Sequence, residues 1–171
     1  MYLSKAKIHF NQRPVYVEQG SWINLFSSGA EWMVERLNEI SSENQYIFNR
    51  DVHFTTYGLG KYLLCLLAFF ISFLLFSKTH IALTPLSILV FYVFEVALLF
   101  LFPLLIDGVK HPIITSIKMT WEIGFFKAVL IVIPIAIFML VGLFDIKKRY
   151  HNWHIGCLAI LFWYLDERKN D

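Results

Sequence analysis

Two pairs of residues have the spacing of metal ligands. Asp107 and His111 lie four positions apart, and His151 and His154 lie three apart. Spacings of three or four place two side chains on one face of a helix, and carboxylate and imidazole groups bind zinc and iron. If all four residues met on one side of a membrane, they would form the catalytic site of an enzyme acting on a lipid head group.

The arrangement of the apolar segments argues against this shared site. One long apolar run separates the two pairs, and if it spans a membrane, the pairs face opposite sides. The competing interpretation places both histidine positions in the aromatic belt at the bilayer surface. We therefore predict no metal and no cofactor, and we keep the enzyme as an alternative.

A third candidate is a carboxylate inside an apolar run. Glu95 is the ionisable residue between residues 86 and 106, and a charge at mid-bilayer costs at least about 2.5–3.5 kcal/mol. The carboxylate must then be protonated, paired or exposed to a wet cavity. Lys127, near the start of the next run, is the predicted partner. The pair is either a contact between helices or the proton or ion relay of a small transporter subunit.

Long apolar runs must position these groups. About 20 residues cross the ~30 Å of hydrocarbon in a bilayer, and three runs have this length. Residues 153–165 form a shorter fourth run, which we predict to be a short span, and residues 166–171 form a polar tail. The fold class is thus an all-α polytopic membrane protein with three to four transmembrane helices. The long runs are residues 59–77, 85–106 and 121–144, the last with Thr120 as its predicted N-cap.

Residues 1–58 are more polar and predict a small soluble α+β domain of ββαββ type. Tyr2, Ala6, Ile8 and Phe10 alternate with other residues at a period of two, which is typical of a half-buried strand. Residues 15–18 would form the returning strand, and residues 46–48 and 52–54 a second pair.

A helix is expected between the two pairs of strands. One of its faces is apolar at helical spacing, and we predict that this stripe binds the membrane part, the bilayer surface or a partner. The stripe consists of Trp22, Phe26, Met33 and Leu37.

Composition excludes several classes of function. The chain is 57% hydrophobic and 16% charged, against the usual ~25% charged in soluble domains. Its net charge is +2 and it has no basic stripe, so no nucleic acid is expected. Cys65 and Cys157 lie in apolar runs and are expected to pack as hydrophobes. The nucleophile and phosphate-loop motifs of common enzymes are absent from the sequence.

These observations predict a non-catalytic accessory, anchoring or protective subunit that binds another membrane protein or a second copy of itself. We expect it in the inner membrane of a bacterium. No secretory signal precedes the first apolar run, which favours a cytoplasmic N-terminal domain. With every run spanning, the positive-inside rule adds only a slight bias, because the basic cluster at residues 147–149 would face outward.

Overall fold

The computed structural model describes residues 1–17, 24–41, 45–144 and 149–169, and within these ranges the chain is helical and contains no strand. The helices are α1 (Tyr2–Gln12), α2 (Leu25–Ile40), α3 (Phe54–Thr79), the short 3₁₀ helix η2 (Ile81–Leu83), α4 (Leu86–Ala97), α5 (Leu101–Ile106), α6 (Pro112–Ile123), α7 (Phe125–Phe144) and α8 (Arg149–Arg168).

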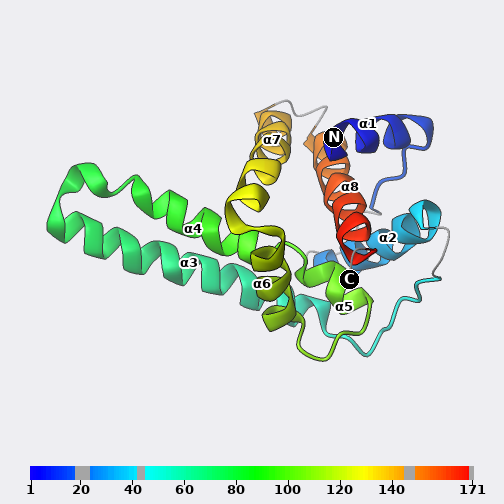
Figure 1. Ribbon diagram of the computed structural model, residues 1–171, viewed down its shortest axis with the longest axis horizontal. Coiled ribbons are helices and arrows are strands. Elements are labelled where there is room, and N and C mark those ends of the chain that lie inside the picture. The colour runs from blue at the N-terminus through cyan, green and yellow to red at the C-terminus, as the bar shows by residue number, and fades with distance from the viewer. Residues whose placement is uncertain (18–23, 42–44, 145–148, 170–171) are drawn as a thin grey trace.

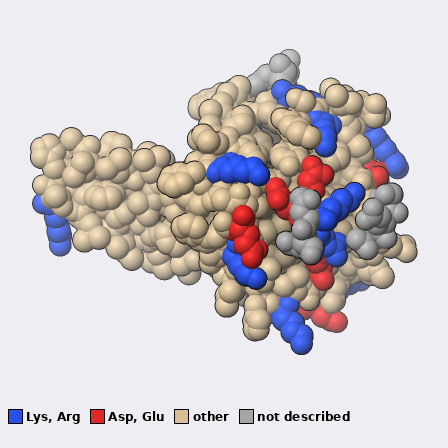
Figure 2. All heavy atoms as spheres, in the orientation of Figure 1, with Lys and Arg blue, Asp and Glu red and all other residues tan. Residues whose placement is uncertain are grey.

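The molecule has two parts, an arm and a head. Helices α3 and α4 run antiparallel and project as a long arm (Figure 1). Helices α1, α2, α5 and α8 form the head, and α6 and α7 lie where the arm leaves it (Figure 1). Charged side chains gather over the head, whereas the arm is uncharged on the visible face except at its tip (Figure 2).

Three helical segments are long and apolar enough to cross a membrane: Phe54–Thr79, Ile81–Ile106 and Phe125–Gly142. Only 11% of the most apolar stretch of the first is buried inside the protein, and a helix that is apolar on every side is typical of a lipid-exposed segment. The length and composition of these helices confirm the prediction of an integral membrane protein.

The predicted second span, residues 85–106, is interrupted. Helix α4 ends at Ala97, the chain turns through residues 98–100, and α5 then enters the head, where Leu101 is 1% exposed. Pro103 explains the break, because its ring clashes with the carbonyl four residues earlier and it cannot donate a hydrogen bond. Only the α4 part of this run therefore belongs to the arm.

The predicted third span, residues 121–144, starts too early. Helix α6 ends at Ile123, Gly124 follows with a φ of +94° that is unfavourable for other residues, and α7 begins at Phe125. Thr120 is not an N-cap: it lies inside α6, and its hydroxyl donates to the carbonyl of Ser116 at 2.9 Å.

The short fourth run, residues 153–165, is the middle of the 20-residue helix α8. This helix packs between α1 and α7, and Leu158, Leu161 and Trp163 are completely buried. Within the described residues α8 is not among the candidate spans. It is the central helix of the head.

The predicted N-terminal α+β domain is wrong, because the described part of residues 1–58 has no strand. Residues 2–12 form α1 instead. Tyr2, Ala6 and Phe10 are four apart, a spacing that fits a helix as well as a strand. Ala6 and Phe10 are fully buried, whereas Ile8, which a strand would place beside them, is 63% exposed.

The helical assignment of α1 can be tested with Phe10→Ala and Ile8→Ala. Phe10 packs against Tyr16 and His151, so its truncation should cost about 3–5 kcal/mol of unfolding free energy. Ile8→Ala should change it by less than about 0.5 kcal/mol, as is usual for exposed positions. Denaturation in detergent measures both, and equal losses would support the strand instead.

Candidate functional site

The base of the arm holds an ion pair between α3 and α4. Lys61 Nζ lies 2.9 Å from Glu95 Oε2, and the two side chains are 9% and 23% exposed. The pair contains the predicted intramembrane carboxylate but not the predicted lysine. Lys127 is exposed on α7, and no salt bridge joins it to Glu95. The second carboxylate oxygen, Oε1, is buried without a hydrogen-bond partner among the described residues.

The choice of lysine follows from where the helices end. A straight second span to residue 106 would place Glu95 near its middle, opposite the start of the third run. Because α4 ends at Ala97, Glu95 lies close to the exit of the arm, one turn from the head. Lys61 lies seven residues after the start of α3 and faces it there. The pair therefore holds the two arm helices together at their base.

A second polar cluster joins α5 to the end of α8. The Tyr164 hydroxyl donates to Asp107 Oδ2, and Arg168 Nη1 lies 3.2 Å from Asp107 Oδ1. The same Arg168 nitrogen donates to the Tyr46 hydroxyl at 2.6 Å. Burial raises the pKa of Asp107, although Tyr164 and Arg168 oppose this shift. Burial, followed by the neighbouring Asp107, also raises the pKa of Tyr164.

A cavity of about 310 Å³ lies beside this cluster, between α5, α6 and α8. Its charged lining is balanced, with Lys118 and Arg168 against Asp107 and Glu122. Lys118 and Glu122 also pair with each other at 3.4 Å. The four groups thus neutralise one another, and the lining has no excess charge that would select an anion or a cation.

His154 is the centre of a third cluster, inside an aromatic shell. The Val17 backbone N–H donates to Nε2 at 2.9 Å, so Nδ1 carries the proton and donates to the Tyr150 carbonyl at 2.5 Å. The ring lies edge-on to Trp32 at 5.1 Å between centroids and to Tyr16 at 5.3 Å. Both ring nitrogens are therefore occupied, and burial lowers the pKa of the imidazole.

The structure does not bring the four predicted catalytic residues together. Asp107 bonds to the last turns of α8, whereas His154 lies about 15 Å earlier on that helix at ~1.5 Å per residue. His151 contacts Tyr16, and His111 is exposed ahead of α6. Among the described residues no group of three His, Cys, Asp or Glu side chains is placed to hold a metal ion.

The predicted interaction stripe on α2 is largely used inside the chain. Phe26 stacks on Phe102 at 5.9 Å, and its ring fills the space that a Cβ at Gly58 would need. Leu37 is fully buried, Met33 is half-buried against the core, and Trp22 lies outside the described residues. The Phe26 contacts join α2 to α3 and α5, whereas Met33 and Leu37 pack in the core of the head.

Sequence analysis missed a buried arginine on the same helix. The Arg36 side chain is 1% exposed and pairs with Glu39 at 2.5 Å and Glu35 at 3.0 Å. Glu39 also binds Arg13, at 2.8 Å, just after α1. The i,i+3 spacing of Arg36 and Glu39 indicates an ion pair on one face of a helix. The same spacing is equally typical of an exposed face, so it does not predict burial.

No known protein family matches this chain, and no curated protein or solved structure matches it.

A double-mutant cycle distinguishes the two possible partners of Glu95. Combining Lys61→Met with Glu95→Gln should give a coupling of about 0.5–3 kcal/mol in unfolding free energy, as for residues in direct contact. Lys127→Met with Glu95→Gln should be additive within about 0.5 kcal/mol. Denaturation in detergent measures both cycles, and coupling to Lys127 alone would contradict the structure.

The stability of the head should depend on the charge of His154. Its pKa is lowered in the folded state, so the unfolded chain binds the proton more readily. The stabilisation is fully present above the unfolded value of about 6.5 and is lost as pH falls through the lower folded value. His154→Gln should therefore flatten the fall in melting temperature between about pH 7.5 and pH 5. An unchanged pH profile would show that the buried imidazole does not contribute.

Proposed function

We propose that the protein is a non-catalytic accessory or anchoring subunit of a membrane assembly and that its arm binds another membrane protein. The supporting observation is the arm itself, which carries large apolar side chains on the outside of both helices. Within α3 these include Leu67 at 50% exposure, Phe70 at 56% and Leu74 at 58%. Such a surface is compatible with lipid and with the transmembrane helices of a partner.

The polar groups of the head support a structural role. Asp107 and Arg168 bind each other, Arg36 binds Glu39, and the two nitrogens of His154 are held by the backbone. Polar groups that are already paired in this way stabilise the fold, whereas a catalytic group must be within reach of a substrate. The polar groups that could have served in catalysis thus contribute to the stability of the head.

Association of the arm with a partner would depend on packing. In lipid there is no hydrophobic force between apolar helices, so they associate through van der Waals contact and interhelical hydrogen bonds. Among the small residues of the arm, Ser72 and Ser87 are buried between its own helices, whereas Gly60 and Ala82 near its two ends are exposed. The middle of the outer face carries bulky side chains, which fit grooves of a larger partner better than a close helix dimer.

The proposed location is the inner membrane of a bacterium, with the head in the cytoplasm. The apolar helices support the membrane part of this proposal. The cytoplasmic head is supported by basic residues that lie near the two ends of the arm in sequence, Arg50, Lys61 and Lys110, since such residues remain on the cytoplasmic side.

A photo-crosslinking phenylalanine analogue at Phe70 tests the proposal. Irradiation of native membranes should give one discrete adduct with a different protein, because Phe70 faces outward at mid-arm. The matched control places the analogue at Ile8, which is 63% exposed against 56% for Phe70 but lies on the head, where this adduct should be absent. Mass spectrometry of the purified chain identifies the adducts.

Two outcomes would contradict the accessory role. Lipid adducts alone at Phe70, together with purification of the chain by itself in mild detergent, would show that the arm is only an anchor in lipid. An adduct of twice the mass of the chain would show a homo-oligomer.

A further inference from the structure

We infer that the α3–α4 arm alone crosses the bilayer, and that α7 lies along the surface of the same membrane with one face in the lipid. Three helical segments have the length and composition of a span, but their arrangement allows only two of them to cross together. The ligand of the α6–α7 face is therefore the lipid bilayer. This inference concerns topology and stands without the proposed partner.

The first argument is the direction of the helices. Helix α7 runs across the long axis of the arm (Figure 1). Two helices that cross so steeply cannot both run through one planar slab. When the arm is placed along the bilayer normal, α7 comes to lie in the plane of the membrane, at the level where the arm leaves the head.

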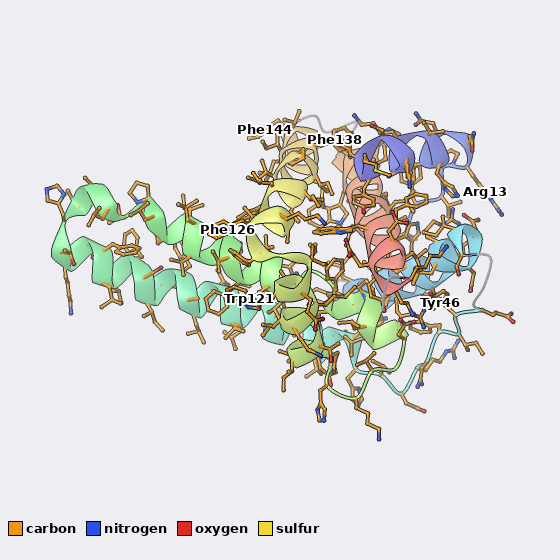
Figure 3. All side chains as sticks on the ribbon, viewed as in Figure 1. Arg13, Tyr46, Trp121, Phe126, Phe138 and Phe144 are labelled. Atoms are coloured by element: carbon orange, nitrogen blue, oxygen red, sulfur yellow. The ribbon has the colours of Figure 1, made fainter. Side chains whose placement is uncertain are left out.

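The second argument is the apolar face that α6 and α7 present towards the arm. Trp121 is 65% exposed and Phe126 82% exposed, and both lie on the side from which the arm projects (Figure 3). Leu130 continues this face at 68% exposure. A helix that lies in the interface typically buries such a face at the boundary between head groups and acyl chains, where tryptophan is enriched.

The third argument is what covers the opposite face of α7. Phe138 points towards α8 (Figure 3), its carbonyl accepts from Asn152 Nδ2 at 3.1 Å, and Lys7 Nζ lies 4.2 Å from its ring. Helix α8 packs against this face of α7, and α1 packs against α8. Lys5 of α1 and Asp166 of α8 pair there at 3.8 Å. If α7 crossed the membrane, these charges would enter the hydrocarbon with it, which is strongly unfavourable.

The arm has the length that this placement needs. From Lys61 to Thr79, α3 is about 27 Å long at ~1.5 Å per residue, close to the ~30 Å of the hydrocarbon core. The Lys61–Glu95 pair then lies at the near boundary and Lys78 at the far one. No other Asp, Glu, Lys or Arg occurs between residues 62 and 94, so the segment inside the lipid is uncharged.

This topology also gives a clear orientation. The chain has 15 Lys and Arg residues, and Lys78 is the only one between residues 62 and 94. The other 14 lie outside this stretch, in the segments that this topology leaves on the side of the head. The positive-inside rule then places the head, with both termini, in the cytoplasm.

Single-cysteine labelling of the full-length chain tests the topology. Cysteines are introduced at Lys110, Tyr150 and Lys78, which lie before α7, after α7 and at the tip of the arm, in a Cys65→Ala, Cys157→Ala background. All three positions are exposed. A membrane-impermeant maleimide should label Lys110→Cys and Tyr150→Cys only in inverted membrane vesicles, and Lys78→Cys only in intact spheroplasts.

Two results would overturn the inference. Labelling of Lys110→Cys and Tyr150→Cys from opposite sides would show that α7 spans. Labelling of Lys78→Cys from the same side as Lys110→Cys would show that the arm does not cross. If the cysteine-free background does not accumulate, the same three substitutions are made in the wild-type chain, whose own labelling gives the background to subtract.

Discussion

The packing around α8 is the interaction on which the rest of the molecule depends. Trp163 is fully buried, stacks on Tyr2 of α1 at 5.9 Å and meets Phe100 edge-on at 5.1 Å. Phe100 lies in the turn between α4 and α5, so the arm is fixed to the centre of the head where it ends. An aromatic residue of this kind buries about 150–250 Å², so these contacts tie the end of α4 to the core of the head.

The break in the second apolar run is stabilised by polar groups on a neighbouring helix. When α4 ends at Ala97, its last carbonyls lose their intrahelical donors. The Ser116 hydroxyl of α6 donates to the Ala97 carbonyl at 3.1 Å, and Thr120 Oγ1 lies 3.4 Å from the Val96 carbonyl. The Ser116 hydroxyl thus supplies a donor for the Ala97 carbonyl. The Val96 carbonyl also accepts from the Leu99 backbone N–H at 3.2 Å. Ser116 and Thr120 hold α6 against the end of α4. Because α7 starts directly after α6, this contact also positions α7 at the base of the arm.

The sequence predicts the class of the protein and the course of α3, because a long run of apolar residues has few alternatives to a membrane helix. It also contains the signals for the two corrected boundaries, Pro103 and Gly124, at places where helix interiors are disfavoured. The N-terminal helix was not predicted, because apolar residues four positions apart lie on one face of a helix and also on one face of a strand. The Lys61–Glu95 pair could not be found before the end of α4 was known, because the depth of an acid in a span depends on where the span stops.

The role of α7 is the part that hydropathy cannot decide. A helix in the interface is normally recognised by one polar and one apolar face. In α7 both faces are apolar, because one packs on the buried side of α8 and the other meets lipid: Val132 and Ile135 are 7% and 2% exposed, whereas Leu130 is 68% exposed. A protein core and a bilayer select the same residue types, so a helix between the two has the composition of a span. The position of its neighbours decides between a spanning and an interfacial α7. Here the neighbour is the charged helix α1, which packs on the side of α8 away from α7.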